Sequence, residues 1–170
     1  MKRTILLVVV SALILVSYRY APAAASKGNN EAEIKALEQR IVDGAKARDV
    51  DAIMKNYVDD DSLLVFDVIP PRQYVGAEAL HKNWQGFLDG FDGRITLENS
   101  DMEVISEGKL AYAHYIAHVA GKGKDGNPID MTLRLTDVLR EINGKWLIVH
   151  EHMSVPVDVT TGKADLTSKP

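Results

Sequence analysis

Two closely spaced histidines near the C-terminal end are the first residues whose types could do chemistry. His150 and His152 lie one residue apart in "GKWLIVHEHMSVP", where a run of alternating apolar residues ends. An imidazole can bind a metal, transfer a proton near neutral pH or hydrogen-bond to a ligand. The pair could therefore be metal ligands, catalytic groups or the polar rim of a binding pocket.

An acidic residue on the preceding segment is the expected partner of one of these histidines. Asn143-Gly144 between two apolar runs predicts a two-residue hairpin turn. In that register Asp137 faces His150 on the more apolar side of the hairpin. A one-residue bulge would break this pairing.

The expected pair of Asp137 and His150 has three readings. It could simply satisfy a buried carboxylate. It could fix the tautomer of a histidine that acts as an acid, a base or a ligand clamp. Apolar surroundings could instead keep Asp137 protonated, so that it donates a hydrogen bond to a ligand oxygen.

A further histidine pair, His114 and His118, shares one face of the segment 110–120, and alanines occupy most of the other face. His114 lines a pocket if this face points inward, and it belongs to a dimer surface or to solvent if the face points outward. Two imidazoles of an H-x-H pair could share a metal, but the chain has no cysteine and no H-E-x-x-H motif. We therefore expect neither a metal nor a cofactor.

The periodicity of apolar residues predicts the elements that position these groups. Helical spacing predicts a first helix that begins at Asn30, a second that Asp49 caps, and a third over residues 77–91. A buried strand is expected at 62–67, and alternation predicts strands at 94–106, 110–120, 129–142 and 145–154. The order predicts an α+β fold: a cone-shaped, curved antiparallel sheet packed on three N-terminal helices.

The open mouth of such a cone is the expected small-molecule site. Tyr57 and Trp84 lie on the core-facing stripes of the second and third helices, where they could pack in the core with a polar tip at the pocket. Trp146 lies on the apolar face of the last hairpin. We expect these three aromatic residues, with His152 and His114, to line the pocket.

The N-terminal residues resemble a targeting segment. Lys2 and Arg3 precede an apolar run at residues 5–16, and "APAAAS" offers an A-x-A cleavage site that ends at Ala25. Since about 20 apolar residues are needed to span a bilayer, a cleaved signal is favoured over a permanent anchor. We expect a signal peptide at 1–25, a flexible linker at 26–30, one domain at 31–157 and a polar tail at 158–170, in a periplasmic or secreted protein.

The charge of the chain limits its partners. The formal charge is −4 at pH 7, and cleavage of the basic leader would make the mature chain more acidic still. A nucleic acid or an anionic membrane is therefore not an expected partner.

The stretches "QRIVDGAKARDVDAIMKNYVDDDSLLVFD", "YVGAEAL" and "TDVLREINGKWLIVHEHMSVP" resemble the SnoaL-like branch of the ketosteroid-isomerase and nuclear-transport-factor superfamily. The resemblance covers about residues 31–157. It implies the curved-sheet cone, and a homodimer through the outer face of the sheet.

The resemblance to the ketosteroid isomerases also implies roles for single residues. Asp67 in "VFDVIPPRQYVG" matches their general base, and Asp137 in "TDVLRE" matches their hydrogen-bond-donating acid. Their oxyanion tyrosine follows "QR" on the first helix, where this chain has Ile41. His150 or Tyr57 could supply the missing donor.

We therefore expect a pocket for a small hydrophobic or carbonyl-containing molecule. Asp67, Asp137 and His150 are the expected catalytic residues for proton transfer of the isomerase, cyclase or hydratase type. The alternative is a non-catalytic binding or dimerisation module.

Overall fold

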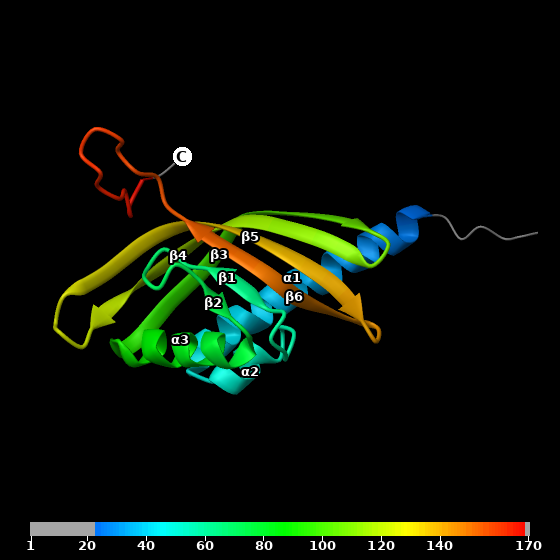
Figure 1. Cartoon of the computed structure of the whole chain (residues 1–170), viewed down its shortest axis with the longest axis horizontal. Helices are drawn as coiled ribbons and strands as arrows, with labels where there is room; N and C mark the ends of the chain where they lie inside the picture. The colour runs from blue at the N-terminus through cyan, green and yellow to red at the C-terminus, as the bar shows by residue number, and fades with distance from the viewer. Residues whose placement is uncertain (1–22, 169–170) are drawn as a thin grey trace, which may run out of the picture.

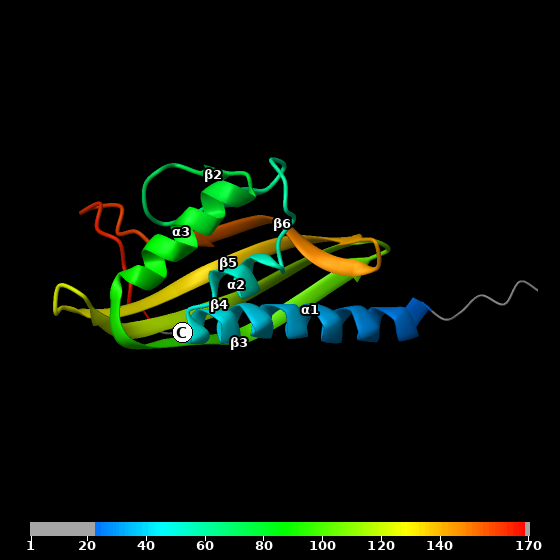
Figure 2. The ribbon, with the colours of Figure 1, turned by 90° about the horizontal axis from the view of Figure 1, so that it is seen from below.

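The computed structural model describes residues 23–168, so the expected signal run at 5–16 lies outside the described residues. These residues form three helices and one six-stranded sheet. The helices lie on one face of the curved sheet, and the C-terminal tail lies at the end of β6 (Figures 1 and 2). The elements are α1 (Ala23–Ala47), α2 (Val50–Met54), β1 (Leu64–Phe66), β2 (Tyr74–Val75), α3 (Ala77–Asp89), β3 (Phe91–Glu107), β4 (Leu110–Gly123), β5 (Pro128–Ile142) and β6 (Lys145–Ser154).

The helices follow the apolar periodicity of the sequence. On α1, Ile34 and Leu37 are fully buried, and they anchor the helix on the core. The carboxylate of Asp49 accepts a hydrogen bond from the Ala52 amide at 2.9 Å, which caps α2 as expected. α1 begins at Ala23 rather than at Asn30, so residues 26–30 are helical in the structure.

The sheet has the strand order β2-β1-β6-β5-β4-β3. Its four long strands form the predicted antiparallel meander. β1 pairs with β6 in parallel, so the sheet is mixed rather than wholly antiparallel. β2, which the sequence did not indicate, pairs with β1 and ends just before α3. The α+β fold with a curved sheet against three helices is confirmed.

The predicted pairing of Asp137 with His150 is wrong. The hairpin register holds from the turn as far as Leu139, which pairs with Ile148. One extra residue on β6 then forms a bulge, so that Val138 pairs with His150 and Asp137 with Glu151. Bulges bend a strand and re-aim its side chains. Glu151 therefore takes the inward place that was expected for His150.

The structure also decides which face of β4 points inward. Ala111, Ala113 and Ala117 are buried with Tyr115, whereas His114 is exposed on the outer face. Because alanine side chains are small, this part of the inner face leaves space between the sheet and the helices. The cavity and the buried acids described below occupy that space.

The tail after β6 turns back toward the sheet. Val157 pairs with Ala164, and the Thr132 amide on β5 donates a hydrogen bond to the Leu166 carbonyl at 2.7 Å. Within residues 23–168, no helix combines the length and the apolar character needed to cross a membrane.

Candidate functional site: an apolar cavity with two acids in its wall

A cavity of about 120 Å³ lies between α3 and the inner face of the sheet. Most of its lining is apolar. Its polar groups are few, which is typical of a site that binds a small organic molecule and orients it with a small number of contacts. Those groups belong to Asp67, Asn83, Asn99, Tyr115 and Glu151.

Asp67 lies in the cavity wall immediately after β1. Its Oδ1 accepts a hydrogen bond from the Val68 amide at 2.6 Å, and its Oδ2 accepts one from the Asn83 side chain at 3.0 Å. Both bonds orient the carboxylate, and a half-buried carboxylate in an apolar wall can accept a proton from a bound molecule. The predicted position of Asp67 at the end of the first strand is confirmed, whereas its role as a base stays a prediction.

Glu151 enters the same cavity from β6. Only 2% of this residue is exposed, and its Oε2 accepts a hydrogen bond from the Tyr57 hydroxyl at 2.8 Å. Burial, together with the charge of Asp137, raises the pKa of Glu151 well above its ordinary value. The cavity wall therefore carries two carboxyl groups in different environments.

Two further acids lie behind Glu151 in the core. Asp137 on β5 is fully buried and Glu38 on α1 is 1% exposed. The Tyr115 hydroxyl lies between them, 2.9 Å from Asp137 Oδ2 and 3.1 Å from Glu38 Oε2. This triad of acids, Glu38, Asp137 and Glu151, links α1 to the cavity.

The environment of the triad favours the protonated form of each acid. Burial and the nearby charge of Glu151 raise the pKa of Glu38 to about 8. Burial and the charge of Glu38 raise the pKa of Asp137 well above its ordinary value. Burial and the neighbouring acids also raise the pKa of Tyr57 and Tyr115, so both phenols keep their protons and donate hydrogen bonds.

The other predicted site residues are divided between the cavity and the core. Trp84 lines the cavity as expected, and its ring packs edge-on against Phe87 at 5.7 Å. Tyr57 and Asp137 do not line the cavity. They lie behind Glu151, where Tyr57 holds it with a hydrogen bond and Asp137 is its cross-strand neighbour.

The three predicted histidines lie away from the cavity, on the outer face of the sheet. The Nδ1 of His150 lies 2.8 Å from the Leu64 carbonyl, and the rings of His150 and His152 pack edge-on against Phe66 at 5.1 and 5.6 Å. His114 approaches Glu103 at 3.5 Å. Across the described residues, no three His, Asp or Glu side chains are arranged to hold a metal ion.

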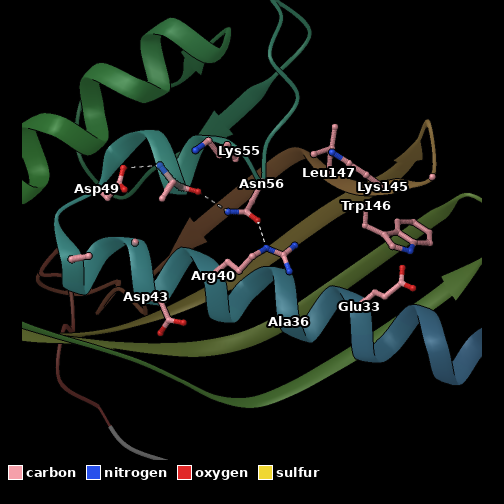
Figure 3. Close-up of a pocket in the computed structure, with 14 residues that line it drawn as sticks. Glu33, Ala36, Arg40, Asp43, Asp49, Lys55, Asn56, Lys145, Trp146 and Leu147 are labelled. Carbon is pink, nitrogen blue, oxygen red and sulfur yellow. Dashed lines mark hydrogen bonds between the residues drawn. The ribbon is translucent and has the colours of Figure 1, made fainter.

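Trp146 faces a second hollow, an open groove of about 780 Å³ that α1, α2 and the β5–β6 hairpin form (Figure 3). The Arg40 Nε donates to Asn56 Oδ1 at 3.0 Å, and the amide of buried Asn56 donates to the Ala52 and Ile53 carbonyls. The groove carries acidic and basic side chains together. Trp146 therefore does not line the cavity, contrary to the prediction.

Sequence reasoning missed Glu38, Asn83, Tyr115 and Glu151. Glu38 had a detectable signal, because it interrupts the apolar stripe of α1 between Leu37 and Ile41. Glu151 stands between the two histidines, but only the bulge in β6 turns it inward. Ile41 is 6% exposed in the core, and the phenols near the acids come instead from Tyr57, just after α2, and from Tyr115 on β4.

Comparisons with known proteins agree with this architecture. A family model described as a SnoaL-like domain matches residues 34–158. An NTF2-like protein of unknown function from Pseudomonas putida KT2440 superposes with a TM-score of 0.75 at 30% identity, over 84% of this chain and 98% of that chain. An NTF2-like superfamily protein from Salmonella enterica serovar Typhimurium LT2 superposes with a TM-score of 0.71 at 20% identity, over 81% and 99% of the two chains.

A structure described as a putative dehydratase of the NTF2-like family, from Streptomyces avermitilis, has a TM-score of 0.67 at 11% identity. It covers 77% of this chain and 99% of its own. A search of curated proteins gave no match. The family match spans most of the chain and agrees with the cone of helices and curved sheet, and we conclude that the chain belongs to the SnoaL-like domain family.

Proposed function

We propose that this protein binds a small carbonyl compound in its cavity and transfers a proton on it, in chemistry of the isomerase or dehydratase type. The single observation that carries the proposal is that Asp67 and Glu151 line the same apolar cavity. Two carboxyl groups whose environments differ are the usual arrangement for a base and an acid in one site.

In the proposed step, Asp67 takes a proton from the carbon next to the carbonyl group. The electron pair of that C–H bond moves into the C–C bond, and negative charge develops on the carbonyl oxygen. A hydrogen-bond donor of the cavity wall then stabilises this oxygen. In an isomerase the proton then returns to a different carbon. In a dehydratase it passes to a hydroxyl group one carbon further along, whose C–O bond breaks as water leaves, while the enolate re-forms the carbonyl group and a C=C bond.

The volume of the cavity limits the molecules that it admits. About 120 Å³ corresponds to roughly four water molecules in the liquid, well below the ~300 Å³ or more of a pocket for a drug-sized ligand. We therefore propose a single small ring or a short chain as the substrate.

We also propose that the protein is exported and that it forms a homodimer. The basic start and apolar run of residues 1–16 support a cleaved signal peptide and a periplasmic or secreted location, which N-terminal sequencing of the mature protein tests. Ile105, Leu110 and Tyr112 are 52%, 55% and 40% exposed around the β3–β4 hairpin. Exposed apolar side chains that gather in one place support a homodimer through the outer face of the sheet.

Exchange of solvent deuterium into cyclohex-2-enone tests the function without knowledge of the natural substrate. In D2O the wild-type protein should label the carbon next to the carbonyl faster than buffer does, and Asp67→Asn should slow this by about a hundredfold or more. Binding of the enone should be largely unchanged. Asp89→Asn, which removes an exposed acid at the end of α3, is the matched control.

One observation favours a second function, non-catalytic binding of the same class of molecule. Ile41 fills the place where the resemblance to the isomerases requires an oxyanion tyrosine, and it is buried in the core. If the protein binds the enone but both the wild type and Asp67→Asn exchange at the buffer rate, the catalytic proposal fails and the binding function stands.

A further inference from the structure

Asp67 has no positively charged partner among the described residues. Its two hydrogen-bond donors, the Val68 amide and the Asn83 side chain, are both neutral. The ion pairs within residues 23–168 involve other acids. None of the described side chains that line the cavity belongs to Lys, Arg or His. Because a partly buried charge is costly without an opposite charge beside it, the cavity wall carries a negative charge that no ion pair of the described residues balances.

The ionisable groups on which the charge of Asp67 acts do not balance it either. Burial raises the pKa of Tyr74, and the charge of Asp67 raises it further. Burial and the charge of Asp137 raise the pKa of Glu151, and the charge of Asp67 adds to this rise. Acids and phenols are neutral with their protons and negative without them, so neither group supplies a positive charge. A bound molecule can supply it instead.

Two aromatic side chains of α3 share the cavity with Asp67. Trp84 and Phe87 both line it, with their ring centroids 5.7 Å apart. Trp84 directly follows Asn83, the residue that donates to Asp67, and Phe87 lies one helical turn beyond Asn83. The face of an aromatic ring attracts a cation, and that of Trp does so most strongly. A carboxylate among aromatic and apolar side chains is therefore suited to an organic cation.

We propose that the cavity binds a small primary ammonium compound, whose N–H groups donate to the carboxylate of Asp67 and whose carbon atoms pack on Trp84 and Phe87. Each Asp67 oxygen accepts one hydrogen bond within the protein, and a carboxylate oxygen can accept two, so each keeps a place for a further donor. The inference goes beyond the proposed function, because it concerns binding and uses Asp67 as a counter-ion rather than as a base. An ammonium compound and a carbonyl compound would compete for the same cavity.

The charge of the cavity wall defines the order of preference among ligands of one size. A carboxylate would lie beside Asp67 without a base to balance it, which is strongly disfavoured. A neutral alcohol can donate a hydrogen bond to Asp67, but it lacks the positive charge that strengthens such a bond. The cavity should therefore prefer a cation to a neutral molecule, and a neutral molecule to an anion.

Titration with cyclohexylammonium, cyclohexanol and cyclohexanecarboxylate tests this order, because the three compounds share one ring and differ in charge. At neutral pH and fixed ionic strength, cyclohexylammonium should shift the indole signal of Trp84 in a 1H–15N NMR spectrum until it saturates. Cyclohexanol should bind about tenfold more weakly, and cyclohexanecarboxylate should cause no shift. Equal affinity for the cation and the alcohol, or saturable binding of the carboxylate, would overturn the inference.

Asp67→Asn removes the charge and keeps the size of the side chain. It should weaken the binding of cyclohexylammonium by about tenfold or more and leave that of cyclohexanol unchanged. Asp89→Asn removes an exposed acid at the end of α3 and should bind both compounds as the wild type does. Wild-type affinity of Asp67→Asn for cyclohexylammonium would refute the role of Asp67. If the spectrum of Asp67→Asn shows an unfolded protein, the wild-type series alone decides.

The outcomes separate this inference from the proposed function. If the Trp84 signal responds to cyclohex-2-enone but not to cyclohexylammonium, the inference fails and the proposed function is unaffected. If the signal responds to cyclohexylammonium but not to the enone, the inference stands and the carbonyl compound is the wrong ligand class. If it responds to neither compound, both proposals fail.

Discussion

A buried carboxyl group that keeps its proton acts as a hydrogen-bond donor rather than as an anion. Glu38, Asp137 and Glu151 lie in one continuous cluster in which burial is the largest cause of each raised pKa. Asp67 differs because it is half-buried and accepts two hydrogen bonds from neutral N–H groups. The difference between these environments, rather than the residue types, assigns the acid and base roles in the proposal.

This account predicts an unusual dependence of stability on pH. The pKa of Glu38 is raised from 4.5 to about 8 in the folded protein, so the folded state binds more protons than the unfolded state between these values. The contribution of Glu38 to the free energy of unfolding should therefore be greatest below pH 4.5. It should be lost as the pH rises from 4.5 through about 8.

Glu38→Gln should make this fall shallower, because the amide carries no titrating proton. Asp137 and Glu151 would still contribute in the same direction, so the dependence should weaken without disappearing. Urea unfolding at a series of pH values measures how the free energy of unfolding depends on pH. Glu33→Gln changes an exposed acid on the same helix and should leave the slope as it is. Equal slopes in the wild type and Glu38→Gln would show that Glu38 is ionised in the folded protein.

How far the site could be predicted differs between its residues. Asp67 could be placed because it follows a short buried strand and precedes a proline-containing loop. Trp84 could be placed from the helical period of α3. The burial of Glu38 could have been predicted, because it lies within the apolar stripe of the first helix. An acid in such a stripe either has a buried hydrogen-bonding partner or shows that the buried face of the helix was assigned wrongly. Its partner Tyr115 could not, because the contact depends on tertiary packing.

At the scale of the elements, the Asn143-Gly144 turn predicted the register of the last hairpin correctly as far as Leu139 and Ile148. The bulge after Ile148 could not be predicted, since it depends on how strongly β6 bends over the helices. That single extra residue exchanges the histidines for Glu151 on the inner face. The short strand β2 was also missed, because two residues are too few to show a periodic pattern.

At the scale of the elements, the outer face of the sheet is the proposed homodimer surface. Ile105 on β3 pairs directly with Tyr112 on β4, and both side chains are exposed. A charge at such a pair should destabilise an apolar interface without disturbing the core behind it.

We therefore expect a dimer in solution, and a monomer for the double variant Ile105→Glu, Tyr112→Glu. Light scattering coupled to gel filtration measures the mass of each. Val159→Glu places the same charge at an almost fully exposed apolar residue of the tail and should remain dimeric. A monomeric wild-type protein at the same concentration would remove the outer face as a dimer surface.

For the whole molecule, the described residues form at least two separate hollows: the cavity between α3 and the inner face of the sheet, and the groove that α1, α2 and the β5–β6 hairpin form. The cavity is small, largely apolar and lined by two acids. The groove of Figure 3 is larger, open and of mixed charge. The proposed function belongs to the cavity because Asp67 and Glu151 converge there on a largely apolar space.

The two tryptophans of the chain allow one measurement to decide between these sites. Trp84 lines the cavity and Trp146 lines the groove, so their indole N–H signals in a 1H–15N NMR spectrum report each site separately. Trp84→Phe assigns the two signals. On titration with cyclohex-2-enone, the account predicts a saturable shift of the Trp84 signal and a constant Trp146 signal. A shift of Trp146 alone, or of neither signal, would contradict the central claim that the cavity is the functional site.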